Sequence, residues 1–351
     1  MTPDEERNEA IILTIAYHDN SFRRSVICPR FAHDTSSKPP LRIPHSIFRP
    51  LTTSPVSNLG DFEQLPREIM MVLCLHLDLY SCIRFRQTNR LARQVVTAVP
   101  EYRAVASYGH RALHAILRTD MGDNFTLAEL YRQLVTGGCV VCGAFGVFIY
   151  LPLAARCCYP CIISAQALRT ASLASVVKFS GLPAEQLRRL MRVVTTVRGT
   201  YEKRYGISWF KSGHRMELVS AAEAVRVMQS LGLWHGPSGP VASLGKDAEG
   251  ARCMVSAVLP LLDPTTGKIE HGLVCGSCER ALDRLPVEEA CRRQGVMYSK
   301  QGILDHLNSC SGAQEEWTRW GEKTIEMVRE IRELREKREI ARKAGQDMTL
   351  P

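Results

Sequence analysis

The sequence predicts a mainly α-helical protein of several modules, with small β-hairpin elements that are held by metal. Apolar residues recur at helical spacing through much of the chain from Leu65 onwards, which favours a series of short amphipathic helices. Two groups of closely paired cysteines stand between the helical segments, in a pattern typical of metal ligands. The chain has 351 residues, 45% of them hydrophobic, so it can form two or three domains that each bury a core.

The composition argues against a membrane protein and against a disulfide-bonded secreted protein. No apolar run reaches the roughly 20 residues that a transmembrane helix needs, and the polar start MTPDEERNEA does not have the pattern of a secretory signal. Thirteen cysteines in such a chain favour metal ligands or reduced thiols over disulfides. We therefore expect a protein of the cytoplasm, the nucleus or both, without a membrane partner.

The first helical segments follow a stretch rich in turn-forming residues. Residues 65–80 have helical periodicity, with Pro66 in the first turn, where a backbone N–H has no acceptor within the helix. Residues 83–96 form a second periodic stretch, which Pro100 is expected to close. Two or three short helices in about 40 residues are too few to bury a good core by themselves. This predicts that a partner protein covers their apolar face.

The segment LPREIMMVLCLHLDLYSCIRFRQTNRLARQVV resembles an F-box: it opens with Leu-Pro-x-Glu-Ile, continues as a leucine-rich helix and ends with an Ile/Phe-Arg pair and a polar-basic close. The resemblance implies a helical unit that docks on the Skp adaptor of a cullin–RING ubiquitin ligase. By position, it implies adaptor-binding roles for Leu65, Pro66, Ile69, Leu73, Ile83 and Phe85. The sequence departs from the family pattern at Thr88 and Asn89, where Val-Ser is frequent, and at Leu91, where an aromatic residue is usual. An ordinary amphipathic helix pair is the alternative.

Further helices are expected on the C-terminal side of this segment. Residues 104–117 and 127–134 have helical periodicity, and Thr126 with Glu129 forms the pattern of a capping box at the start of the second helix. The Gly-Gly pair at 137–138 is expected to end it. Two later helices are expected over residues 183–197 and 221–231, before a linker over residues 236–250.

The first cysteine group consists of Cys139-x-x-Cys142 and Cys158-x-x-Cys161, with fifteen residues between the pairs. Two CxxC pairs at this separation can point four thiolates at one tetrahedral zinc ion, while the chain between them returns as a hairpin. Cys157 is an alternative ligand to Cys158, although the two-residue spacing favours Cys158. Packing as small apolar residues and a dithiol redox site are the other interpretations. The segment also resembles a zinc-ribbon-like element that follows the F-box in a group of fungal F-box proteins.

The second group consists of Cys275-x-x-Cys278 and His306-x-x-x-Cys310, with a spacer of twenty-seven residues. His306 and Cys310 stand one helical turn apart, so both ligand atoms can project from one face of a helix that Ser299 caps. A CxxC turn beside an unrelated core histidine is the alternative. Since each group supplies four protein ligands and leaves no open position, we expect two structural Zn²⁺ ions per chain. The fallback ligands are Cys253, Cys291 and His271.

Two further elements complete the C-terminal third of the chain. Residues 255–261 and 269–274 flank the turn sequence Asp-Pro-Thr-Thr-Gly at 263–267, which predicts a β-hairpin. Residues 315–344 are dense in charges at i,i+4 spacing, which predicts a long helix. The apolar stripe in the first half of this helix is expected to dock on the body or on a partner, while the second half projects into water.

No motif indicates catalysis: the glycines do not form a phosphate-binding loop, and neither HExxH nor GxSxG occurs. The expected function is the one that the resemblance implies, a non-catalytic substrate receptor that binds the Skp adaptor of a cullin scaffold and an unidentified protein target. The alternative is zinc-dependent binding of nucleic acid, because residues 156–215 hold eleven Lys and Arg against two acidic residues.

These observations divide the chain into seven expected modules. In chain order they are a disordered tail (1–60), the F-box (61–103), a helical part with the zinc-ribbon-like element (104–180), a basic helical region (181–235), a linker (236–250), a hairpin with the second zinc site (251–312) and a charged C-terminal helix (313–345).

Overall fold

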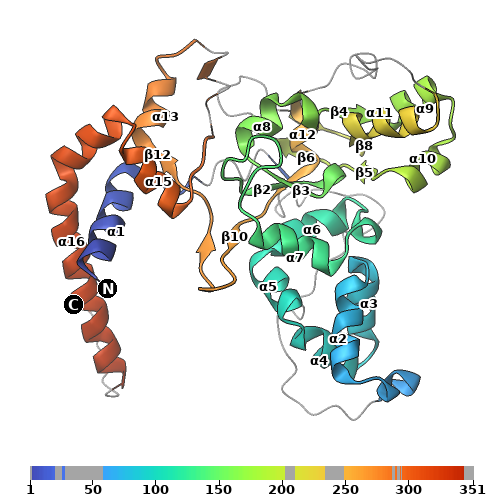
Figure 1. Cartoon of the computed structure of the whole chain (residues 1–351), viewed down its shortest axis with the longest axis horizontal. Helices are drawn as coiled ribbons and strands as arrows, with labels where there is room; N and C mark the ends of the chain where they lie inside the picture. Colours follow the sequence, from blue (N-terminus) through green and yellow to red (C-terminus); the bar gives the residue numbers. More distant parts are fainter. Residues whose placement is uncertain are drawn as a thin grey trace. The chain divides into compact units, whose positions relative to one another are not determined.

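In the computed structural model the chain forms two compact units. The central unit comprises residues 20–271, and the terminal unit combines residues 1–19 with residues 272–351. The structure describes residues 2–19, 26–27, 58–201, 210–233, 249–286, 289–290, 293 and 295–343. These residues are mainly helical with several small sheets, as the sequence predicts (Figure 1). None of the helices among them combines the length and the apolar character that crossing a membrane demands.

The described part of the central unit begins, after residues 26–27, with a series of short helices. They are η3 (Gly60–Gln64), α2 (Arg67–His76), α3 (Leu79–Thr88), α4 (Arg90–Ala98), α5 (Pro100–Tyr108), α6 (His110–Arg118) and α7 (Leu127–Val135). The predicted helix 65–80 ends early because the Asp78 side chain caps α3 by accepting from the Ser81 N–H at 2.8 Å. Pro100 starts α5 rather than closing α4, since the first helical position tolerates a residue without an N–H. The capping box of Thr126 and Glu129 is confirmed.

Helices α2 and α3 are joined to the rest of the central unit by backbone contacts. Asp78 and Thr126 form an antiparallel β-bridge, and the Leu79 N–H donates to the Phe125 carbonyl at 2.9 Å. The Tyr80 hydroxyl donates to the Leu117 carbonyl at 3.0 Å. Helices α2 and α3 therefore pack directly against the segments that follow them.

Small antiparallel sheets follow in the second half of the central unit. Their strands are β2 (Phe148–Tyr150), β3 (Ala155–Cys157), β4 (Thr170–Ser172), β5 (Val194–Thr195), β6 (Gly199–Tyr201), β7 (Phe210–Ser212), β8 (Glu217–Ser220), β9 (Ser256–Val258), β10 (Leu261–Leu262) and β11 (Ile269–Glu270). The strand orders are β3-β2-β9, β4-β8-β5, β6-β7 and β10-β11. The predicted hairpin around residues 263–267 is present but short, because residues 256–258 pair with β2 instead.

Short helices cover these sheets: α8 (Tyr159–Ser164), α9 (Leu173–Ser180), α10 (Ala184–Leu190), α11 (Ala221–Ser230) and α12 (Glu249–Cys253). The prediction of a helix over 183–197 is wrong after Leu190. Residues 193–197 are Val-Val-Thr-Thr-Val, a β-branched run that prefers extended backbone, and Val194 pairs with Leu218 of β8. Helix α11 confirms the prediction over 221–231. Most of the expected linker lies outside the described residues, and α12 occupies its last two positions.

The terminal unit is built from both ends of the chain. It contains α1 (Pro3–Ile15), β1 (Ala16–Tyr17), β12 (Val274–Cys275), α13 (Gly276–Leu282), α15 (Lys300–Leu307) and α16 (Ser311–Lys343). The expected disordered tail over 1–60 is wrong for its first part: Thr2 and Glu5 form a capping box, and Ile11 and Ile15 of α1 are buried. The rest of that expected tail up to residue 57, except 26–27, lies outside the described residues.

Helix α16 is a single helix of 33 residues, as predicted. It packs against α1, which lies beside it (Figure 1), from Trp317 in its first half to the buried Val328 just past its middle. Glu6 of α1 pairs with Arg329 and Arg332 of α16. The expected module 251–312 is divided, because the hairpin belongs to the central unit and the second cysteine group to the terminal unit.

We expect Gly122→Ala to destabilise the central unit, because a Cβ at this position would lie 2.6 Å from ring atoms of Tyr80. The hydrogen bond from the Tyr80 hydroxyl to Leu117 restrains that ring. Overpacking of this kind costs about 1–3 kcal/mol, which the midpoint of denaturant unfolding measures. Gly213→Ala is the matched control, since no atom lies within 4 Å of its Cβ position. Equal losses in the two variants would contradict the close packing of Gly122 against α3.

Candidate metal centres

The first quartet of ligands, Cys139, Cys142, Cys158 and Cys161, is brought together as predicted. Its four sulfur atoms lie within 4.8 Å of one another, and those of Cys142 and Cys158 are 3.6 Å apart. A tetrahedral ion with metal–sulfur bonds of about 2.3 Å requires sulfur–sulfur distances of about 3.8 Å. The first quartet therefore has the donors and the spacing to hold one metal ion.

The pair Cys139 and Cys142 sits on a tight backbone turn. The Gly143 N–H donates to the Cys139 carbonyl at 2.9 Å, and the Val141 N–H donates to the Cys139 sulfur at 3.4 Å. Gly143 has a φ of 73°, in the left-handed region that favours glycine. The sequence Cys-Val-Val-Cys-Gly thus encodes a turn whose N–H groups point at sulfur.

The pair Cys158 and Cys161 lies at the start of helix α8. Cys158 is the N-cap residue of α8, and Cys161 follows in its first turn. The β2–β3 hairpin returns the chain from the first pair to this helix, and Phe148 pairs with Cys157 in it. The hairpin between the two pairs is present as predicted; one pair comes from a turn and the other from a helix start.

Cys157 is not part of the first quartet. It is buried, and its thiol donates to the Ala155 carbonyl at 3.6 Å. Cys158 therefore takes the fourth position, as the spacing favours. The crowded thiols also influence one another: interaction with the Cys157 and Cys158 thiols lowers the pKa of Cys139, and interaction with Cys139 raises the pKa of Cys158. A bound cation stabilises all four sulfurs as thiolates, which crowding alone opposes.

Arg156 connects the segments around the first quartet by hydrogen bonds. Its position in a basic stretch of the sequence did not predict this role. Its side chain is 1% exposed, and burial lowers the pKa of its guanidinium. The guanidinium donates to the backbone carbonyls of Gln133, Leu134, Gly146, Leu259 and Pro260. One side chain thus connects the end of α7, the chain leading into β2 and the segment after β9.

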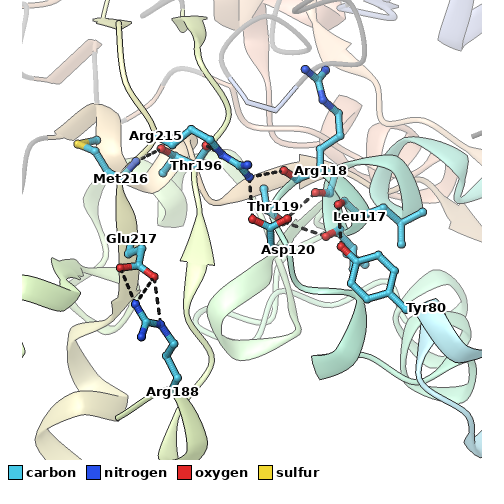
Figure 2. Close-up of polar contacts among 12 residues, drawn as sticks. Tyr80, Leu117, Arg118, Thr119, Asp120, Arg188, Thr196, Arg215, Met216 and Glu217 are labelled. Atoms are coloured by element: carbon cyan, nitrogen blue, oxygen red, sulfur yellow. Dashed lines mark hydrogen bonds and ion pairs between the residues drawn. The ribbon is translucent and has the colours of Figure 1, made fainter. Parts of the chain in front are cut away.

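Several other cations of the basic stretch 156–215 are engaged within the protein. Arg215 contacts Asp120 at 3.0 Å, and Arg188 contacts Glu217 at 2.9 Å (Figure 2). Arg192 pairs with Glu129 at 3.0 Å. Of the described members, these three arginines and the buried Arg156 face internal partners. The charge count alone therefore overstates the positive surface of this region.

The second quartet, Cys275, Cys278, His306 and Cys310, is also assembled, with all ligand atoms within 4.8 Å of one another. The Cys278 sulfur lies 3.3 Å from His306 Nε2 and 3.7 Å from the Cys310 sulfur. Cys275 is the N-cap residue of α13, so each quartet takes one CxxC pair from the start of a short helix. Three thiolates and one imidazole at these distances can hold one metal ion.

His306 and Cys310 do not both lie on helix α15, because α15 ends at Leu307. The Cys310 N–H nevertheless donates to the His306 carbonyl at 3.1 Å, which preserves the expected spacing of one turn. The His306 ring stacks on Tyr298, with ring centroids 4.6 Å apart. Ser299 caps α15 as predicted. Of the fallback ligands, Cys253 and His271 lie outside both quartets, and Cys291 is not among the described residues.

The residues expected to bind an adaptor fall into two environments. Helix α2 and the residues before it expose Leu65 (38%), Ile69 (47%), Val72 (49%) and Leu73 (43%), which we call the α2 patch, and Pro66 is exposed beside it. Ile83 is only 8% exposed and belongs to the helical core, while Phe85 is half-buried with its ring 6.4 Å from that of Phe62. The structure thus places Leu65, Ile69 and Leu73 together on a surface and Ile83 inside.

Comparisons with known proteins give no relative from which a function could be transferred. The chain matches no family model, no curated protein and no solved structure. The F-box interpretation therefore depends on the quoted residues and on the α2 patch. The metal interpretation depends on the geometry of the two quartets.

We expect the purified protein to contain close to two metal ions per chain, one for each quartet. Changing Cys139 and Cys142 to Ser should reduce the content to about one, because two remaining thiols cannot complete a four-ligand site. Elemental analysis after dialysis measures this. Cys74→Ser is the control, because Cys74 is a buried cysteine outside both quartets. Folded protein without metal would contradict both centres.

We expect Arg156→Lys to destabilise the central unit by about 3 kcal/mol, because an ammonium group cannot reproduce the fork of donors and leaves buried carbonyls unpaired. Denaturant unfolding measures the loss. Lys178 is exposed, so the reverse change Lys178→Arg keeps the charge at a site without such packing and is the control. An Arg156→Lys variant as stable as the parent would contradict the bracing role of Arg156.

Proposed function

We propose that this protein is the non-catalytic substrate receptor of a Skp–cullin–F-box ubiquitin ligase, acting in the cytoplasm, the nucleus or both. The observation that carries the proposal is the α2 patch. Leu65, Ile69, Val72 and Leu73 follow i, i+4, i+7 and i+8 spacing and therefore line one face of a helix and its entry. That face is apolar although it is exposed, which is a property of interaction sites.

The opposite face of α2 is already occupied. Met70 and Cys74 are buried, and α2 packs against α4 and α7. Helix α2 thus has apolar side chains on two faces. One face packs within the central unit, and the other, the α2 patch, is exposed. Apolar surface removed from water contributes roughly 25 cal/mol per Å². Binding of a Skp adaptor would remove the α2 patch from water. Burial of these side chains would then contribute favourable free energy that the isolated chain lacks.

We infer that the ions in both quartets are structural zinc. Four thiolates, or three thiolates and one imidazole, form the donor sets that soft tetrahedral zinc sites use. Each quartet fills the coordination sphere with protein ligands, so substrate has no open position at the metal. The ions would stabilise the parts of the receptor that read a protein target. The receptor would act by holding an acceptor lysine near a loaded conjugating enzyme, which is catalysis by proximity.

Binding of nucleic acid is the less favoured function. A nucleic-acid surface needs several free cations along one face, often with aromatic platforms between them. In the basic stretch, Arg156 is buried and Arg188, Arg192 and Arg215 are paired with carboxylates. These contacts support an internal function for these four arginines of the stretch.

The experiment that tests the receptor proposal is binding of the full chain to a purified Skp adaptor. Ile69→Asp with Leu73→Asp places two charges in the α2 patch and should weaken adaptor binding at least 100-fold, because buried charges at the centre of an interface are strongly unfavourable. Both residues are exposed, so the fold should persist. Titration calorimetry or copurification measures the effect.

The matched control is Leu190→Asp, which changes a leucine of similar exposure (42%) on α10. It should leave adaptor affinity and metal content unchanged. Undiminished adaptor binding by the double variant would overturn the F-box assignment. Nucleic-acid affinity that falls steeply with salt, in a chain that ignores the adaptor, would favour the alternative.

A further inference from the structure

The N-terminal segment is attached directly beside the second quartet. Strand β1 pairs antiparallel with β12, so that Ala16 lies opposite Cys275, which is itself one of the four ligands. The Ile15 carbonyl lies 3.7 Å from the Cβ position of Gly276, the residue that follows this ligand. His18 Nδ1 lies 2.9 Å from the Gly272 carbonyl. The first nineteen residues therefore contact the backbone that presents the metal ligand.

The same segment shares a small core with the ligands. Ile11 and Ile15 of α1 are buried together with Leu273, Cys275, Ile303 and Ala313, and the partly buried Cys278 and Cys310 pack against this cluster. Three of the four ligands thus belong to the core that α1 completes. Anything that moves those ligands also changes the surface on which α1 lies.

The elements that carry the ligands are too short to hold their places alone. Helix α13 has 7 residues and α15 has 8, whereas an isolated helix shorter than about 12–15 residues is marginal in water. The twenty-seven residues between Cys278 and His306 separate the two pairs along the chain. Backbone hydrogen bonds between Leu273 and Tyr298 join the segments that lead into these helices. A four-ligand ion would join α13 to α15 directly.

Helix α1 also packs along α16, and ion pairs of Glu6 add to this contact. Glu6 is buried, but its partners Arg329 and Arg332 have side chains that are 62% and 41% exposed. Ion pairs near water contribute little and are screened by salt. The Glu6 pairs therefore add little to the attachment of α1, which depends mainly on apolar packing against α16 and the core of the second quartet.

We infer that the metal ion of the second quartet is a latch for the N-terminal helix: residues 2–19 are docked while the ion is bound and are released when it is removed. This inference goes beyond the receptor proposal and does not depend on the adaptor. Release would expose the apolar face of α1, which includes Ile11 and Ile15. By thermodynamic linkage the coupling is reciprocal, so a chain with undocked α1 must bind the second ion more weakly by the same factor.

The test is amide hydrogen exchange of the full chain, loaded with zinc, in matched variants. His306→Ala removes one ligand, and amides of α1 and β1 should then exchange at least tenfold faster than in the parent. His306→Cys keeps four ligands and should restore the parental protection. Cys142→Ser, which disables the first quartet in the other unit, should leave exchange in α1 unchanged. Protection of α1 in a His306→Ala chain that has lost the second ion would overturn the inference.

The reciprocal measurement uses changes in α1 alone. Ile11→Asp with Ile15→Asp, made in the Cys142→Ser background so that one intact site remains, should lower zinc affinity at least tenfold in competition with a chelator. Leu13→Asp is the control, because Leu13 is exposed on the same helix. Unchanged zinc affinity in the double variant would overturn the inference, even if the His306 variants failed to fold.

Discussion

Seven cysteine sulfurs and one histidine nitrogen, gathered into two quartets, impose the strongest constraint on this chain. Within each quartet the ligand atoms lie within 4.8 Å of one another, although the chain supplies them from segments far apart in sequence. Apart from α1 and α16 beside the second quartet, the adjoining elements are strands of two or three residues and helices of six to eight residues. Structural zinc contributes about 10–16 kcal/mol in small peptides, comparable to the whole stability of a typical domain. With zinc as the ion, metal ligation replaces the extensive core that these short elements lack.

The first quartet is braced from outside as well as by its ligands. Arg156 precedes Cys157 and Cys158 in the chain and donates to carbonyls of three separate segments. A buried guanidinium is costly unless its donors are used, and Arg can use them because its fork is rigid. Gly146, whose carbonyl accepts from Arg156, lies so close to Cys157 that a Cβ would be 2.6 Å from the Cys157 carbonyl. The first quartet, the buried Arg156 guanidinium and the close approach of Gly146 to Cys157 are thus parts of one packed arrangement.

The sequence predicted features that depend on local spacing and failed on features that depend on distant partners. Both quartets could be predicted because the two ligands of each CxxC pair, and those of His-x-x-x-Cys, are close together along the chain and meet through local backbone geometry alone. The capping box at Thr126 and the long helix α16 are local in the same sense. Helix α1 was missed although Thr2, Pro3 and Glu5 form a local start signal. What the sequence could not show is the burial of α1, which depends on α16 and on strand pairing with residues more than 250 positions away. Arg156 was counted as surface charge because only the assembled carbonyls reveal why it is buried.

Pairing with strands that are distant in sequence also explains two wrong predictions of secondary structure. Residues 256–258 were assigned to a hairpin because a turn sequence follows them, yet the edge of β2 provides a pairing partner that only the folded chain offers. The stretch 193–197 was read as helical although its β-branched residues fit a strand, and β8 decides the outcome. Local propensity is a weak guide where a neighbouring strand is available.

The α2 patch and the first quartet lie in one unit and are joined by consecutive contacts. Helix α2 packs against α7, the backbone at the end of α7 accepts hydrogen bonds from Arg156, and Arg156 lies two residues before the ligand Cys158. In the proposed receptor this continuity has a mechanical value, because transfer by proximity requires that the adaptor-bound face and the target-bound face keep a fixed separation. A flexible tether would lower the effective concentration of the acceptor lysine. The central unit therefore has the construction that a rigid spacer needs, while the second quartet stabilises a separate unit made from the two chain ends.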